Sequence, residues 1–106
     1  MKGTLGKLIP SANTLTTVCT ITNNCSFGEI NILVTNPNVA QAIIDVAIAV
    51  AATPNSNEYI YKSYPLPAAT GPLAINNIIV TAGELVVVRS DKADTIFRVY
   101  GKETVE

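Results

Sequence analysis

The sequence contains no histidine, and this absence excludes the commonest forms of catalysis. Histidine is the usual general base near neutral pH, and it is also the commonest metal ligand. Neither a Ser-His-Asp nor a Cys-His arrangement is therefore available, so the cysteines lack their usual activating base. We predict that the protein is not an enzyme.

Cysteine is also scarce, because the 106 residues include only Cys19 and Cys25. Two cysteines cannot build a multi-bridge disulfide scaffold, and alone they do not complete a tetrahedral zinc site. They either face each other across a hairpin and form one disulfide, or remain two small apolar residues with free thiols. Gly3 and Gly6 match neither the P-loop nor the dinucleotide-binding fingerprint. The sequence therefore predicts no metal and no cofactor.

Charge is low, with charged residues at 14% of the chain against about a quarter in an average domain. The seven basic and eight acidic residues give a net charge of −1, and the basic residues are dispersed along the sequence. Nucleic acids and anionic membranes need dense positive charge, so neither is a predicted partner. The longest apolar tract, residues 39–52, is interrupted by Gln41 and Asp45, and it is shorter than the roughly 20 residues that cross a bilayer.

The chain is 48% hydrophobic despite this low charge. Such a chain is either a somewhat sticky monomer or a subunit whose apolar surface is covered by other proteins. The second interpretation favours assembly into a larger structure.

Turn residues recur at short intervals along the chain, and the segments between them are rich in Val, Ile, Thr and Tyr. This pattern is typical of a sandwich or barrel of short strands. The predicted strands are Thr14–Ile21, Glu29–Thr35, Glu58–Tyr64, Leu73–Val80, Leu85–Ser90 and Thr95–Tyr100. Pro65 and Pro67 follow the third of these and predict an edge strand or an early end, because proline has no amide to donate.

The apolar tract 39–52 allows two interpretations. At a period of two residues, one face carries Ala42, Ile44, Val46, Ile48 and Val50, which predicts a strand. At a period of 3.6 residues, its alanines suit a helix. The unbroken alternation and the β-branched large residues favour the strand.

Short connections favour antiparallel neighbours, because parallel crossovers need a dozen or more residues. We therefore predict an all-β fold, a two-sheet antiparallel β-sandwich of about seven to eight short strands. The length fits a single domain over residues 1–106. Residues 1–12 either contribute an eighth strand near Leu5–Ile9 or form an extended N-terminal arm.

Paired carboxylates remain a route to hydrolysis, because glycosidases use two of them. Glu29 and Asp45 are the candidates, since both lie on the polar faces of predicted strands. The plainer interpretation, which we favour, is a row of side chains that faces solvent or a partner.

Tyr59, Tyr61 and Tyr64 are the candidate interface residues. Alternation places Tyr59 and Tyr61 on one face of their strand. Tyrosine supplies rigid contact area with a polar end, so these residues suit contact with a protein or stacking on a sugar ring. The plainer interpretation is that they are strand residues covered by the neighbouring sheet.

A series of motifs along the chain resembles a group of small structural proteins of phages, as in phages of marine bacteria and cyanobacteria. The motifs are LTTVCTI, NILVTNPN, VAIAVAATPNSNEYI, PLPAATGPL, IIVTAGELVVVRSD and FRVYGKE, and together they cover nearly the whole sequence. Cys19 stands where an aromatic residue is usual in that group, and Thr22-Asn23-Asn24 replaces a turn that commonly contains proline. These differences affect the first turn and leave the strand pattern intact.

The resemblance implies a β-sandwich component of the virion, present in many copies and commonly trimeric or otherwise oligomeric. We expect a capsid decoration or cement protein that contacts other virion proteins and stabilises the particle. The alternative is a tail, baseplate or fibre-associated module that contacts the host.

Overall fold

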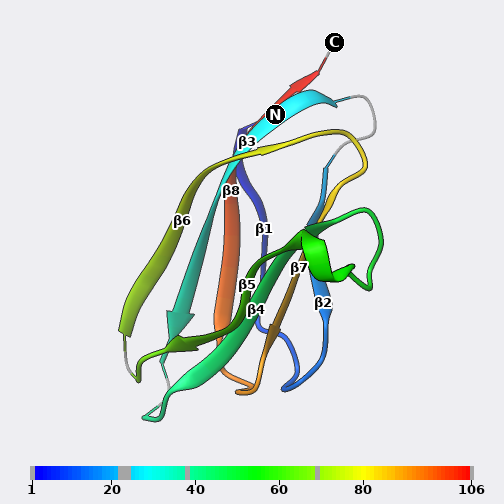
Figure 1. Cartoon of the computed structure of the whole chain (residues 1–106). Helices are drawn as coiled ribbons and strands as arrows, with labels where there is room; N and C mark the ends of the chain where they lie inside the picture. The colour runs from blue at the N-terminus through cyan, green and yellow to red at the C-terminus, as the bar shows by residue number, and fades with distance from the viewer. Residues whose placement is uncertain (1, 22–24, 38, 69, 106) are drawn as a thin grey trace.

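Eight strands account for most of the chain in the computed structural model, which describes residues 2–21, 25–37, 39–68 and 70–105 (Figure 1). They are β1 (Lys2–Leu8), β2 (Thr16–Thr20), β3 (Cys25–Asn36), β4 (Ala42–Ala49), β5 (Tyr59–Leu66), β6 (Thr70–Val80), β7 (Leu85–Ser90) and β8 (Ile96–Val105). A short 3-10 helix, η1 (Ser56–Glu58), precedes β5. The predicted all-β chain is confirmed, and residues at its N-terminus supply the eighth strand, β1.

The strands form two four-stranded antiparallel sheets, sheet 1 in the order β1-β8-β3-β6 and sheet 2 in the order β2-β7-β4-β5. β1 pairs with β8, β2 with β7, β3 with β6 and β4 with β5. The chain is thus one long hairpin whose turn is the β4–β5 connection. Its successive strand pairs lie alternately in sheet 1 and in sheet 2. This nested pairing is that of an eight-stranded jelly roll. The predicted two-sheet antiparallel β-sandwich is confirmed.

The core lies between the two sheets and follows from the alternation of the strands. Ile30, Ile32 and Val34 of β3 and Ile44 and Val46 of β4 are fully buried. The strand interpretation of the apolar tract is therefore confirmed, and the helix interpretation is wrong. The predicted apolar face ends one residue pair early, because β4 ends at Ala49 and Val50 is exposed in the following connection. The other members of the core cluster are Ile21, Ala42, Leu66, Ile75, Val80, Val86, Val88, Phe97 and Val99.

The outer face of sheet 2 is also covered in part. Asp45, Ala47 and Ala49 of β4 are buried although they alternate with core residues, and so is Val87 of β7. Ala47 lies opposite Val87 on one side and Tyr59 on the other. The β4–β5 connection, which carries η1, lies close to β4 and in front of sheet 2 in Figure 1. Small side chains on this face leave room for that close approach.

Features of the edge strands β1 and β5 oppose further pairing. Gly6 of β1 lies so close to β2 that a Cβ atom at this position would be 2.5 Å from the Val18 carbonyl oxygen. Because glycine has no side chain, β1 can approach β2 at this point. As Pro65 predicts, β5 is an edge strand, and it ends at Leu66. Pairing of β5 with β4 is also interrupted at two places. Proline and bulges of this kind discourage strand addition from another chain.

Candidate functional site

The register of the strands gives the sandwich two distinct ends. The end of β1 lies opposite the start of β8, with Leu8 paired to Phe97, and the end of β3 lies opposite the start of β6, with Asn36 paired to Thr70. The β1–β2, β3–β4, β5–β6 and β7–β8 connections therefore share one end, called here the loop end. The two chain termini lie at the opposite end (Figure 1).

The loop end presents apolar side chains on a tightly bonded frame. Val39 is 98% exposed and Ile9 is 59% exposed. The buried Asn36 side chain donates hydrogen bonds to the carbonyl oxygens of Ala40, Leu66 and Pro67 at 3.0–3.1 Å, which joins the β3–β4 and β5–β6 connections. These bonds hold the backbone that carries the exposed apolar tip at Val39.

The β7–β8 connection is joined to the same frame. Asp91 accepts a hydrogen bond from the Ile43 amide at 2.8 Å through Oδ1, and the Asp91 amide donates to the Ile43 carbonyl oxygen. The hydroxyls of Ser90 and Thr95 are buried and lie 2.7 Å apart across the turn. Each of these buried polar groups therefore has a partner, which stabilises the loop end without a metal or a disulfide at these positions.

The three candidate tyrosines are divided between the two faces of β5. Tyr61 and Tyr64 pair with Val46 and Ile44, pack against the core, and stack on each other with ring centroids 4.5 Å apart. Tyr59 pairs with Ala47 on the outer face, and the Lys62 ammonium lies 4.3 Å from its ring centroid. The prediction that Tyr59 and Tyr61 share a face is wrong, because a register shift between them turns the strand over. Only Tyr59 is on the outer face of sheet 2.

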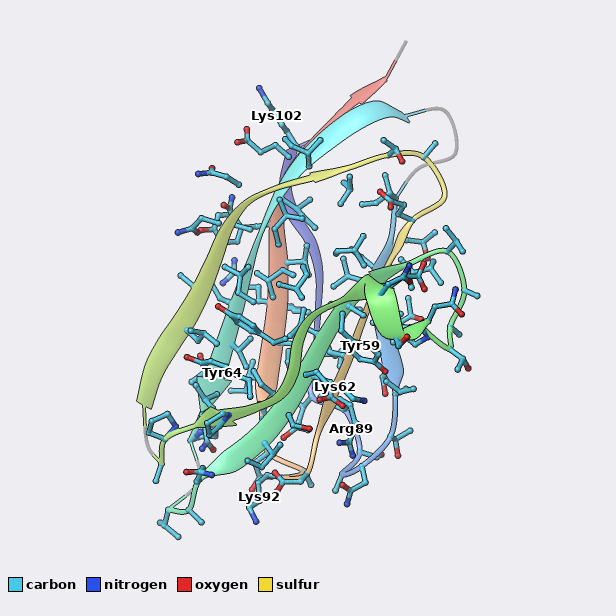
Figure 2. The ribbon with its side chains drawn as sticks, viewed as in Figure 1. Tyr59, Lys62, Tyr64, Arg89, Lys92 and Lys102 are labelled. Atoms are coloured by element: carbon cyan, nitrogen blue, oxygen red, sulfur yellow. The ribbon has the colours of Figure 1, made fainter. Side chains whose placement is uncertain are left out.

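Asp45 joins three strands of sheet 2 through its carboxylate. The side chain is 1% exposed. Its Oδ1 accepts a hydrogen bond from the Ser63 amide of β5 at 2.6 Å, and its Oδ2 accepts one from Arg89 Nε of β7 at 2.9 Å. The ammonium of Lys62 lies 3.7 Å from the same Oδ2. Figure 2 shows Tyr59, Lys62 and Arg89 close together on this side of the molecule.

The geometry at Ser63 depends on this carboxylate. Ser63 has a positive φ of 54°, which L-residues other than Asn and Asp rarely adopt. Burial of the Asp45 carboxylate favours its neutral form, but the Ser63 amide and the cations of Arg89 and Lys62 outweigh this and hold the pKa of Asp45 below its ordinary value. Asp45 therefore stabilises the β5 bulge and the sheet edge as a carboxylate anion.

Glu29 and Asp45 do not form a carboxylate pair. Glu29 lies on β3, on the outer face of sheet 1, opposite Lys102 and Ile79. Asp45 lies on the outer face of sheet 2, so the core separates the two carboxylates. Lys62 and Arg89 were not predicted from the sequence as the partners of Asp45. The available signal was a charged residue inside an alanine-rich outer face, because such a carboxylate needs nearby cations once it is buried.

The remaining predictions on chemistry concern cysteine, metals and membranes. Cys19 lies on β2, whereas the side chain of Cys25 lies outside the described ones. The two alternatives for this pair, one disulfide or two thiols, therefore stay predictions. The described residues contain no cluster of three or more His, Cys, Asp or Glu side chains able to hold a metal ion. In the same ranges, no helix has the length and apolar character needed to span a membrane.

Comparison with protein families, curated proteins and solved structures gives no significant match to this chain. Many unrelated functions occur on the same β-sandwich architecture, so the fold alone does not identify an activity. The surfaces described above are therefore the basis for a functional proposal.

Proposed function

We propose that this protein is a bacteriophage virion structural protein, namely a capsid decoration or cement protein that binds the particle surface and stabilises it. The series of motifs that resembles small phage structural proteins supports this role. The jelly roll is also a fold that viral capsid proteins use, among other classes.

The observation that carries the proposal is the loop end, where exposed apolar side chains stand on a firmly bonded frame. Val39 and Ile9 project into solvent there, and the Asn36 hydrogen bonds hold the connections together. A cement protein needs surfaces that keep their shape when they meet neighbouring subunits, because ordering a mobile loop on binding costs free energy. Burying the two side chains against a capsid subunit would stabilise the contact at about 25 cal/mol per Å² of apolar surface.

Many copies of the protein on one particle would each make such a contact. A small contact that repeats over a symmetric particle gives strong total attachment without any one contact being large. The protein would act as a homo-oligomer, for example a trimer, joined through faces or ends of the sandwich. The bulges and Pro65 of β5 oppose open-ended pairing through that edge.

The test adds purified protein back to phage heads that lack it. Wild-type protein should raise the temperature at which the heads rupture, and Val39→Asp combined with Ile9→Asp should remove most of this effect, because both side chains are exposed and the fold does not need them. Val50→Asp is the matched control, since Val50 is 71% exposed but belongs to the β4–β5 connection at the other end. Heads that rupture at the same temperature with and without the wild-type protein would contradict the proposal.

A second candidate is a tail, baseplate or fibre-associated adhesion module. Tyr59 favours it, because this half-buried ring lies on the outer face of sheet 2, and a tyrosine ring can stack on a sugar of the host surface. Labelling intact virions with an antibody against the protein separates the two candidates. Label on the head supports decoration, and label on the tail supports adhesion.

A further inference from the structure

One side of the sandwich is formed by the edge strands β5 and β6. β5 is the last strand of sheet 2 and β6 is the last strand of sheet 1. On the opposite side, β1 lies against β2 at Gly6. No comparable contact joins β5 to β6 in the described part of the chain. In Figure 1, β6 runs along one side of the molecule, and β5 ends near the start of β6. This side is called here the β5–β6 side.

The hydrophobic core reaches the molecular surface on the β5–β6 side. Tyr61 and Tyr64 of β5 stack on each other, and Leu73 and Ile78 are apolar residues of β6. All four pack against the core cluster, yet each is only half-buried. Figure 2 shows Tyr64 on the side of the molecule that carries β6. Aromatic and aliphatic side chains therefore keep part of their surface in water here, and a partner could cover it.

The two strands are almost free of charge. β6 has no charged residue from Thr70 to Val80, although edge strands commonly carry charges, lysine above all. Lys62 is the charged residue of β5. Its ammonium lies beside Asp45 and over the ring of Tyr59, on the outer face of sheet 2. A contact through the β5–β6 side therefore need not remove a charge from water.

The backbone of both strands is too irregular for a long ladder with another chain. Pairing of β5 with β4 is interrupted twice. On β6, Asn76 and Asn77 together lie opposite Asn31 of β3, and Asn77 has a positive φ of 61°. The Asn77 amide donates to Asn31 Oδ1 at 3.1 Å. Such bulges interrupt the row of donors and acceptors along a sheet edge. A partner on this side would therefore make contact through side chains.

A second copy of this chain fits the β5–β6 side better than it fits the outer faces of the sheets. The outer face of sheet 1 carries the exposed cations of Lys7 and Lys102, which would lose water in such a contact. The β4–β5 connection lies in front of sheet 2 and prevents a flat contact there. Two β5–β6 sides, in contrast, bring no charges of one sign together and supply apolar surface to each other. A patch that binds an identical patch does so about a two-fold axis, which closes the assembly as a dimer.

The size of this side is sufficient for a small interface between two copies. β6 has 11 residues, so it spans about 35 Å at the rise of a β-strand, and stacked sheets lie about 10 Å apart. With the width of the side chains, two copies would bury on the order of 1,000 Å² in total, which is near the lower limit for a specific interface. We therefore expect a weak dimer.

We propose that two copies of this chain associate through their β5–β6 sides about a two-fold axis. The proposal rests on the fold and goes beyond the proposed function, which names no surface for the contact between copies. The contact gives a dimer in place of the trimer named above as an example. Tyr61, Tyr64, Leu73 and Ile78 would lose their remaining contact with water in it.

Sedimentation of the purified full chain from micromolar to millimolar concentration measures the association without any phage component. The mass should rise from that of a monomer to that of a dimer. The rise should persist at high salt, because it depends on apolar burial and not on charge. In the chain labelled with nitrogen-15, the amide signals that shift with concentration should centre on Tyr61, Tyr64, Leu73 and Ile78. A chain that stays monomeric or forms a trimer would overturn the proposal, and so would shifts centred on the loop end or on the outer face of sheet 1.

Ile78→Glu and Ile79→Glu form a matched pair of variants. The two residues are adjacent on β6, but Ile78 is half-buried against the core, whereas Ile79 is 62% exposed on the outer face of sheet 1. Ile78→Glu should weaken the dimer about tenfold or more, because its carboxylate would lose water in the contact. Ile79→Glu should change the affinity less than about twofold, as expected for a residue outside the contact.

The amide spectrum of each variant shows whether it is folded, because Ile78 also packs against the core. Ile78→Thr keeps a β-branched side chain and should weaken the dimer about threefold through the loss of apolar surface. The amide shifts of the wild type do not depend on the folding of any variant. Equal effects of the Ile78 and Ile79 variants on the dimer would overturn the proposal.

Heads that lack the protein separate this inference from the proposed function. A dimer that leaves their rupture temperature unchanged would overturn the proposed function and leave the inference standing. A chain that stabilises the heads but is monomeric at every concentration in free solution would overturn the inference and leave the proposed function standing.

Discussion

The two outer faces of the sandwich use the same kinds of cation in opposite ways. On sheet 2, Lys62 and Arg89 flank the buried carboxylate of Asp45. On sheet 1, Lys7 stands opposite Arg98, and each of the two is exposed. Sheet 2 therefore uses its cations to hold its own strands, whereas Lys7 on sheet 1 is directed at solvent.

This difference follows from what lies at the centre of each face. A buried carboxylate is stable only with cations and hydrogen-bond donors around it, so the cations of sheet 2 serve the fold. Like charges on directly opposite residues destabilise a strand pair slightly, so Lys7, which lies opposite Arg98, should add no stability to the fold. Variants on the two faces should therefore change the free energy of unfolding in opposite directions.

Removing the carboxylate at the centre of sheet 2 should have the largest effect. We expect Asp45→Ala to lower the free energy of unfolding by about 3 kcal/mol, because it leaves the Ser63 amide and two cations without their acceptor. Asp45→Asn keeps an acceptor for Ser63 and should cost less. Urea denaturation at neutral pH measures both, with Glu29→Gln on the other face as the control, expected within about 0.5 kcal/mol of the wild type. A change of similar size at Glu29 would remove the contrast between the faces.

Acid should reproduce part of that loss in the unmodified protein. The pKa of Asp45 is lower in the folded chain than in the unfolded one, because the Ser63 amide and the cations outweigh the effect of burial. The corresponding stabilisation is fully present above about pH 4, the unfolded value, and is lost as the pH falls through the folded pKa. The difference in unfolding free energy between the wild type and Asp45→Asn should therefore shrink on acidification. A difference that stays constant from neutral to strongly acidic pH would show that the charge of Asp45 does not stabilise the fold.

Strand positions and the core could be predicted from the sequence because alternation with period two depends only on neighbouring residues. The strand at Leu85–Ser90 has the predicted bounds, and Ile44 and Val46 face the core as their spacing indicates. The order of strands was not predicted, since short connections suggested neighbours in one sheet. In the structure, the β4–β5 connection alone stays within a sheet. Every other short connection crosses between the two layers.

The candidate site was harder to predict because it depends on irregular pairing and on contacts between distant segments. Alternation placed Tyr59 and Tyr61 together, but the register shifts once between them. A bulge leaves little trace in the sequence. Ser63 has a positive φ, but it is not a glycine, so its residue type does not indicate this conformation. Likewise, basic residues at the two ends of the chain are adjacent only because of the register of β1 on β8. That register is a property of the closed sandwich.

The smallest expected effect is that of Lys7→Gln, and its sign is opposite to that of Asp45→Ala. It therefore contrasts the two faces most directly. Lys7→Gln should raise the free energy of unfolding by about 0.3 kcal/mol at low salt, since it removes one of two like charges on directly opposite residues. The gain should disappear at high salt, where the repulsion is screened. Urea denaturation at the two salt concentrations measures it, and Lys92→Gln serves as the control without an opposed cation. A loss of stability at low salt would show that Lys7 serves the fold, as Lys62 and Arg89 do, and the two faces would then no longer differ.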